Sequence, residues 1–140
     1  MVERDVVLGK VSTIDRCLGR IKDVRGPRKA ALLPVDAEDI VVLNLQRAAQ
    51  AAIDLAGHVV ASEGYGLPAD LADAFTLLER HGIIPAELAE RLRKLVGFRN
   101  IAVHQYEALD PHIVEAIVTR HLDDLRGFAA AVLARFLPKP

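Results

Sequence analysis

The sequence contains few aromatic residues and almost no excess of charge. Of its 140 residues, 4% are aromatic and none is tryptophan, whereas 51% are hydrophobic. A core of this composition consists mainly of Leu, Val, Ile and Ala, the usual filling between packed helices. The formal net charge is −1, so the overall balance does not indicate a nucleic-acid binder. Any contact with RNA has to come from a local cationic patch.

Disulfides, a secretion signal and a membrane span are also missing. Cys17 is the only cysteine, which excludes an internal disulfide and fits a reducing compartment. Glu3 and Asp5 stand where a signal peptide needs a basic lead and an apolar run. No stretch reaches the roughly 18 uncharged apolar residues of a membrane span. We therefore expect a cytoplasmic protein with no membrane segment, and its length predicts one domain over residues 1–140.

Hydrophobic periodicity predicts five helices, with no strand-like alternation and no internal repeat. Apolar residues recur every three or four positions over residues 3–24, from Asp36 to Ser62, over residues 69–81, from Pro85 into segment 97–106, and from Pro111 to Phe136. The expected breaks lie at Gly26-Pro27, at Gly64 and Gly66, at Gly82, at Asp110-Pro111, and at Pro138 with Pro140. This pattern predicts an all-α, up-and-down bundle of four long helices plus one short helix.

Finer expectations follow from single residues. Asp36 is the expected N-cap of the second helix, with Asp39 as an acid in its first turn. Leu71 is expected to be buried on the short third helix. Residues 28–34 are interpreted as a connector that carries two basic side chains.

The side chains that can do chemistry gather in residues 97–106, at the end of the fourth helix. This segment holds Arg99, Asn100, His104 and Tyr106. On an ideal helix Arg99 and Tyr106 lie about 20° apart around the axis, whereas His104 lies about 140° from Arg99. A joint site for Arg99 and His104 therefore needs either a break in the helix or a second copy of the chain, and we favour the second copy. A surface face with a cation near a helix end is the competing interpretation.

Metal sites and covalent nucleophiles find little support. The five histidines, at positions 58, 81, 104, 112 and 121, include no pair at helical ligand spacing beside a carboxylate, and there is no cysteine pair. Neither a phosphate-binding glycine loop nor a Gly-x-Ser-x-Gly segment is present. We interpret Asp123 and Asp124 as a solvated face and His121 as a structural or surface residue. The sequence therefore predicts no metal and no cofactor.

What is left is a metal-free site built from Arg99 and His104. Histidine titrates near neutrality, so it can take a proton from one oxygen and give one to another. Arginine keeps its charge and presents a planar fork that fits a phosphate whose negative charge grows in a transition state. Together these roles suit cleavage of RNA by its own 2′-hydroxyl, which leaves a cyclic phosphate and a free 5′-hydroxyl.

Several segments resemble the HepT-like toxins, a branch of the HEPN (higher eukaryotes and prokaryotes nucleotide-binding) superfamily. Arg99, four residues, His104, one residue and Tyr106 match the motif of that branch. Residues 43–48, 53–56, 96–104 and 122–125 are also typical of it. The resemblance spans nearly the whole chain and implies a HEPN-like bundle.

The resemblance also implies roles for the motif residues. Arg99 would clamp the phosphate and His104 would be the general acid or base, in a cleft where the motifs of a homodimer face each other. Asn100 would orient the histidine or the RNA backbone. Tyr106 would receive AMP from a partner antitoxin, a minimal nucleotidyltransferase. The implied function is the toxin of a type II toxin–antitoxin system, a metal-independent endoribonuclease with messenger or transfer RNA as substrate.

Two other classes of function compete with the enzyme. One is a non-catalytic nucleotide- or substrate-binding helical adaptor subunit of a nucleotidyltransferase, which would keep the helices without needing both Arg99 and His104. The other is a structural dimerising bundle. The intact motif favours the enzyme over the adaptor, and a His104→Ala variant that keeps all activity would indicate the structural bundle.

Overall fold

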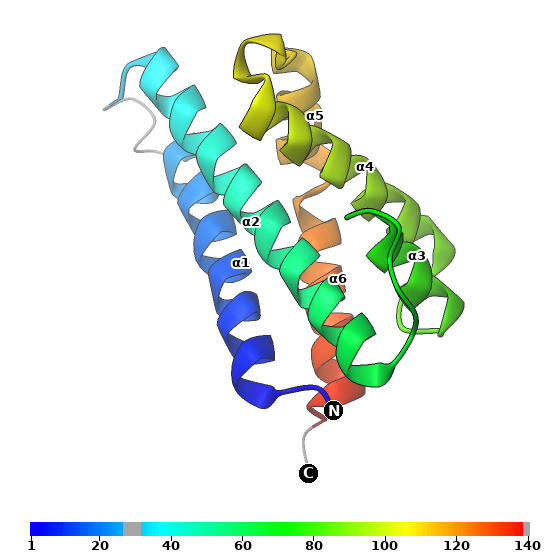
Figure 1. Ribbon diagram of the computed structural model, residues 1–140. Coiled ribbons are helices and arrows are strands. Elements are labelled where there is room, and N and C mark those ends of the chain that lie inside the picture. Colours follow the sequence, from blue (N-terminus) through cyan, green and yellow to red (C-terminus); the bar gives the residue numbers. More distant parts are fainter. Residues whose placement is uncertain (27–31, 139–140) are drawn as a thin grey trace.

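The all-α prediction is confirmed by a computed structural model of the chain, which describes residues 1–26 and 32–138 (Figure 1). The α-helices in this part of the chain are α1 (Arg4–Arg25), α2 (Pro34–Glu63), α3 (Asp73–Arg80), α4 (Ala86–His104), α5 (Pro111–Arg120) and α6 (Leu122–Phe136). A short 3-10 helix, η2 (Tyr106–Ala108), lies between α4 and α5. The predicted connector with Arg28 and Lys29 lies mostly outside the described residues, as do Pro27 and Pro140.

Helix α2 is the centre of the bundle, because it packs against α1, α3, α4 and α6. Figure 1 shows α1, α2, α4 and α6 running alternately up and down, which is the predicted topology. Five alanines of α2 are buried, at positions 48, 49, 51, 52 and 56. Side chains this small let neighbouring helices approach closely. The larger core residues fill the remaining space, and the rings of Phe75 and Phe128 meet edge to face at 5.3 Å.

Most predicted helix ends are found where the sequence places them. Gly64 closes α2 with φ of 68°, and Gly82 follows α3 with φ of 74°. Both lie in the left-handed region that glycine enters without steric cost. Asp110 caps α5 by accepting a hydrogen bond from the backbone N–H of His112 at 2.8 Å, with Pro111 at the first helical position.

Predictions near two helix starts are wrong. Helix α2 begins at Pro34 with Leu33 as its N-cap, so Asp36 is the acid in the first turn and Asp39 lies beyond it. A proline at the first helical position has its φ preset and needs no N–H partner, which allows the earlier start. Leu71 is 44% exposed, because it precedes α3 in a turn where the backbone N–H of Asp73 donates to Oδ1 of Asp70 at 2.9 Å.

The predicted fifth helix is two helices. His121 has φ of −124° and ψ of 3°, which separates α5 from α6. Its ring Nδ1 lies 3.1 Å from Oδ2 of Asp124 in the first turn of α6. This local contact between side chains stabilises the break, and the apolar stripe still continues across it through the buried Val114 and Leu125.

One end of the bundle brings together the end of α1, the start of α2, the end of α4, η2 and the start of α5 (Figure 1). Arg25 of α1 ties part of this end together: it binds Glu115 of α5 at 2.5 Å and Glu38 of α2 at 3.7 Å. Within the described residues, no helix is both long enough and apolar enough to cross a membrane.

Candidate functional site

The four motif residues lie on α4 and on the segment that follows it. Arg99, Asn100 and His104 belong to the last turns of α4, and His104 is its final residue. Gln105 leaves the helix with φ of −143° and ψ of 53°, so Tyr106 begins η2. The expectation that Arg99 and Tyr106 share one helical face is therefore wrong, because the helix ends between them.

Arg99 is half-buried, and the surroundings of its guanidinium are incomplete. Nη1 donates to Oδ1 of Asn100 at 3.0 Å. Nε is buried, yet no acceptor for it is found among the described residues. An unpaired buried donor costs about 1–3 kcal/mol, so an oxygen supplied by a ligand or a second chain would be stabilising here.

His104 presents a different environment. Its side chain is exposed, and within the part of the chain that the structure describes it makes no hydrogen bond or ion pair. Because α4 stays helical through His104, the rotation of about 140° between Arg99 and His104 applies within one chain. Asn100 contacts the arginine, and no hydrogen bond joins it to His104 in the described ranges.

Tyr106 is held by a helix that is remote in sequence. Its phenol donates to Oδ1 of Asp39 on α2 at 2.6 Å, while 46% of the residue stays exposed. The hydrogen bond to Asp39 is the main cause that raises the pKa of the Tyr106 phenol to about 12. Partial burial and the negative charges of Asp39 and Glu38 act in the same direction. The phenol therefore keeps its proton at neutral pH and donates it to Asp39 in this hydrogen bond.

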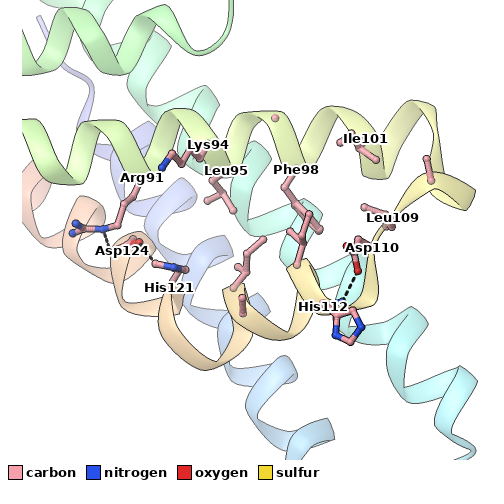
Figure 2. A pocket seen from close by; sticks show the side chains of 15 residues that line it. Arg91, Lys94, Leu95, Phe98, Ile101, Leu109, Asp110, His112, His121 and Asp124 are labelled. Carbon is pink, nitrogen blue, oxygen red and sulfur yellow. Dashed lines mark hydrogen bonds and ion pairs between the residues drawn. The ribbon is translucent and has the colours of Figure 1, made fainter.

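A groove lies beside the motif, between α4 and α5, with a volume of about 690 Å³ (Figure 2). Apolar side chains form much of its wall, among them Leu95, Phe98, Ile101, Leu109 and Ile113. Charged and imidazole groups, which Figure 2 labels, also line it: Arg91, Lys94, Asp110, His112, His121 and Asp124. Neither Arg99 nor His104 is among its lining residues, so it is a separate feature from the motif.

Asp124 corrects one prediction about this region. The side chain of Asp123 is 91% exposed, as expected for a solvated face, but that of Asp124 is only 13% exposed. Its carboxylate accepts from Nε of Arg91 at 2.9 Å and lies 3.1 Å from Nδ1 of His121. Asp124 therefore joins α4 to the α5–α6 junction.

Sequence reasoning did not find two features, the Asp39 contact and the groove. Asp39 and Tyr106 are 67 positions apart, and no periodic pattern links two polar residues on different helices. The groove has His121 in its wall, and the continuous apolar stripe gave no sign of the helix break at that residue. Among the described residues, no group of three or more His, Cys, Asp or Glu side chains could hold a metal ion. Cys17 is buried, and its burial raises the pKa of the thiol.

The comparisons with known proteins agree on one family. The profile of the family Ribonuclease HepT-like matches residues 14–132. The mRNA nuclease HepT of Shewanella oneidensis is 39% identical over 130 residues, which cover 93% of this chain and 98% of that protein. The tRNA nuclease HepT of Aphanizomenon flos-aquae is 36% identical over 70 residues, covering 50% of this chain and 48% of that one.

A solved structure extends the similarity to three dimensions. It is the tri-AMPylated HEPN toxin of Shewanella oneidensis in complex with the MNT antitoxin. Its TM-score is 0.86 at 39% identity, and the superposition covers 94% of this chain and 99% of that one.

Proposed function

The chain belongs to the Ribonuclease HepT-like family, and from this premise we propose that it is the toxin of a type II toxin–antitoxin pair. In this proposal it is an endoribonuclease that cuts RNA without a metal ion, and a nucleotidyltransferase antitoxin silences it by transferring AMP to Tyr106. The names of the relatives support the nuclease, and the AMPylated toxin bound to its antitoxin supports the regulation. We propose that it acts on RNA in the cytoplasm.

The observation that carries the proposal is the unpaired, buried Nε of Arg99. Asn100 accepts a hydrogen bond from Nη1 of the same guanidinium. One nitrogen of the group is therefore fixed, while its buried Nε–H has no acceptor in the described part of the chain. Phosphate oxygens are strong acceptors with the geometry that this fork matches. An RNA phosphate at Arg99 would pair with the permanent positive charge of the guanidinium, and a turn of the side chain that exposes Nε would let the phosphate accept from this donor as well.

The chemistry then follows from two groups. The 2′-oxygen of the RNA attacks the adjacent phosphorus and the bond to the 5′-oxygen breaks, leaving a 2′,3′-cyclic phosphate. His104, exposed and without a partner among the described residues, acts as general acid or base by moving a proton to or from one of these oxygens. Arg99 stabilises the negative charge that grows on the phosphate in the transition state.

The proposed site is shared between two copies of the chain. Since Arg99 and His104 lie about 140° apart on one helix, a single α4 does not direct both side chains at one phosphate. In a two-fold dimer each motif faces the other, and symmetry repeats every group across the axis. Arg99 of one protomer and His104 of its partner then lie on opposite sides of one phosphate.

Cleavage of a labelled single-stranded RNA in excess EDTA tests the enzymatic proposal. We expect cutting to continue, with products that end in a 2′,3′-cyclic phosphate and a 5′-hydroxyl. Activity that disappears with EDTA and returns with a divalent metal would contradict the metal-free chemistry. Purified protein that binds nucleotide and never cuts RNA would instead favour the non-catalytic adaptor.

A further inference from the structure

The hydrogen bond between Tyr106 and Asp39 gives this surface tyrosine a carboxylate at its reacting oxygen. The phenol oxygen lies 2.6 Å from Oδ1 of Asp39, within the 2.6–3.2 Å or so that a general base needs. No residue of η2 is buried, and its backbone hydrogen bonds are local. Among the described residues, the bond to Asp39 is the only side-chain hydrogen bond from η2 to another helix.

We propose that Asp39 is a catalytic residue for the modification of its own chain: it takes the phenol proton of Tyr106 as the tyrosine oxygen attacks ATP. This inference rests on the proposed function, in which Tyr106 receives AMP. The partner supplies ATP and binds it, whereas the acceptor chain supplies both the nucleophile and the base.

Atoms and charges balance in this step. A bond forms between the phenol oxygen and the α-phosphorus of ATP, and the bond between that phosphorus and the bridging oxygen to the β-phosphate breaks. Pyrophosphate leaves with the electron pair of the broken bond. The phenol proton moves to Oδ1 of Asp39, which becomes a neutral carboxylic acid and later releases the proton to water.

A base is needed here because the tyrosine is a poor nucleophile alone. With a phenol pKa of about 12, only about one molecule in 10⁵ carries a free phenolate at pH 7. The phenol becomes strongly acidic only as its oxygen bonds to phosphorus, so the proton has to leave during the attack. A carboxylate already hydrogen-bonded to that proton can accept it without any rearrangement.

The product differs from the starting state in a way that favours release from α2. After modification the tyrosine oxygen is an ester oxygen and has no proton to donate. Once Asp39 is ionised again, its charge and that of Glu38 face a negatively charged phosphodiester at close range. The contact between η2 and α2 is then repulsive. AMP transfer therefore removes the hydrogen bond that held Tyr106 to Asp39 and drives η2 away from α2.

The rate of AMP transfer to an Asp39→Asn variant tests the inference. Purified partner nucleotidyltransferase and ATP labelled at its α-phosphate are mixed with each toxin variant, and incorporation is followed with time. Asparagine keeps the shape and can still accept the hydrogen bond, but it is not a base. We expect incorporation on Tyr106 to slow by about 10²–10⁴, the usual contribution of a positioned base.

Three further variants make the result specific. Glu38→Gln removes the neighbouring charge, which is not hydrogen-bonded to the phenol, and should change the rate by less than about threefold. Asp39→Glu restores a carboxylate and should recover much of the lost rate. Tyr106→Phe should take no label at all. Thermal melts of each variant show whether it is folded.

Opposite outcomes separate base catalysis from attack by a free phenolate. Without the charge of Asp39 the phenol pKa moves from about 12 toward 10.0, which raises the phenolate population by at most about 100-fold. A faster or unchanged rate in Asp39→Asn, with wild type labelled on Tyr106, would overturn this inference alone. Wild type that takes no AMP on Tyr106 would overturn the proposed role of that tyrosine, and with it this inference.

Discussion

The contacts in the middle of the bundle follow from the sequence in a different way from those at its polar end. The polar end is where the end of α1, the start of α2, the end of α4, η2 and the start of α5 come together (Figure 1). In the middle, the apolar residues that recur every three or four positions along α2 are all buried: Val41, Leu45, Ala48, Ala52, Leu55 and Val59. At the polar end, the contacts that matter join residues far apart in sequence: Tyr106 to Asp39, 67 positions away, and Arg25 to Glu115, 90 positions away. Burial follows from a local period, whereas the pairing of polar groups follows from which helix ends meet.

The comparison implies that the two regions can be damaged separately. Replacing His104 or Arg99 by alanine should lower the rate of RNA cleavage by about 10²–10⁴. The melting temperature should stay close to that of wild type, because His104 is exposed and Arg99 is only half-buried. Initial rates and thermal melts on the same samples measure both effects. Full cleavage by both variants would show that the chemistry lies elsewhere in the chain.

The opposite change belongs in the core. Phe128 is fully buried and packs against Phe75, so Phe128→Ala should lower the free energy of unfolding by about 3–5 kcal/mol. Molecules that remain folded should cleave RNA at the normal rate. Urea denaturation measures the first quantity, and rates corrected for the folded fraction measure the second.

The matched control for this core variant is Leu67→Ala. Leu67 is 95% exposed, so its removal should change stability by less than about 0.5 kcal/mol. Equal losses in the two variants would mean that the packing around Phe128 is not the source of stability assigned to it.

The junction of α5 and α6 offers a smaller effect with its own control. Asp124→Asn keeps an acceptor but removes the charge shared with Arg91 and His121. We expect a loss of about 1 kcal/mol, below the 1.5–3 kcal/mol or so of a buried charged hydrogen bond, because both partners are partly exposed. Asp123→Asn, next in sequence and exposed, should cost less. Chemical denaturation of the pair measures the difference, and equal losses would place Asp124 on the solvated face after all.

The smallest effect concerns alkaline pH. The pKa of Tyr106 is about 12 in the folded protein against an ordinary value of 10.0, so the folded state holds the phenol proton more tightly than the unfolded chain. The resulting stabilisation is fully present below pH 10 and is lost as the pH rises toward 12. Wild type should therefore lose stability over this window that Tyr106→Phe does not lose, as measured by denaturant midpoints. Parallel curves for the two proteins would exclude this role of the Asp39 contact.

The residues themselves show where sequence reasoning works and where it stops. Gly64, Gly82 and Asp110 end or begin helices through local backbone geometry, so their positions were predictable. The break at His121 was not, because its apolar stripe continues through the junction and only a side-chain contact with Asp124 marks it.

The candidate site divides in the same way. The residue types and spacing of Arg99 and His104 predict a chemistry without any structure. The end of α4 at His104 and the bond from Tyr106 to Asp39 depend on how the chain turns after α4 and where that turn lies relative to α2, which no local pattern encodes. This position of Tyr106 also changes the expected regulation, because its phenol is directed at Asp39 and not along the face of Arg99.

The central claim is that one cleavage site takes Arg99 from one protomer and His104 from another. Mixing inactive Arg99→Ala and His104→Ala proteins, after brief denaturation and refolding together, tests it directly. A mixed dimer contains one site with both residues intact, so a 1:1 mixture with random pairing should regain about a quarter of the wild-type activity. Each variant refolded alone should stay inactive. A mixture that is as inactive as its components, although exchange of subunits is demonstrated, would contradict the shared site.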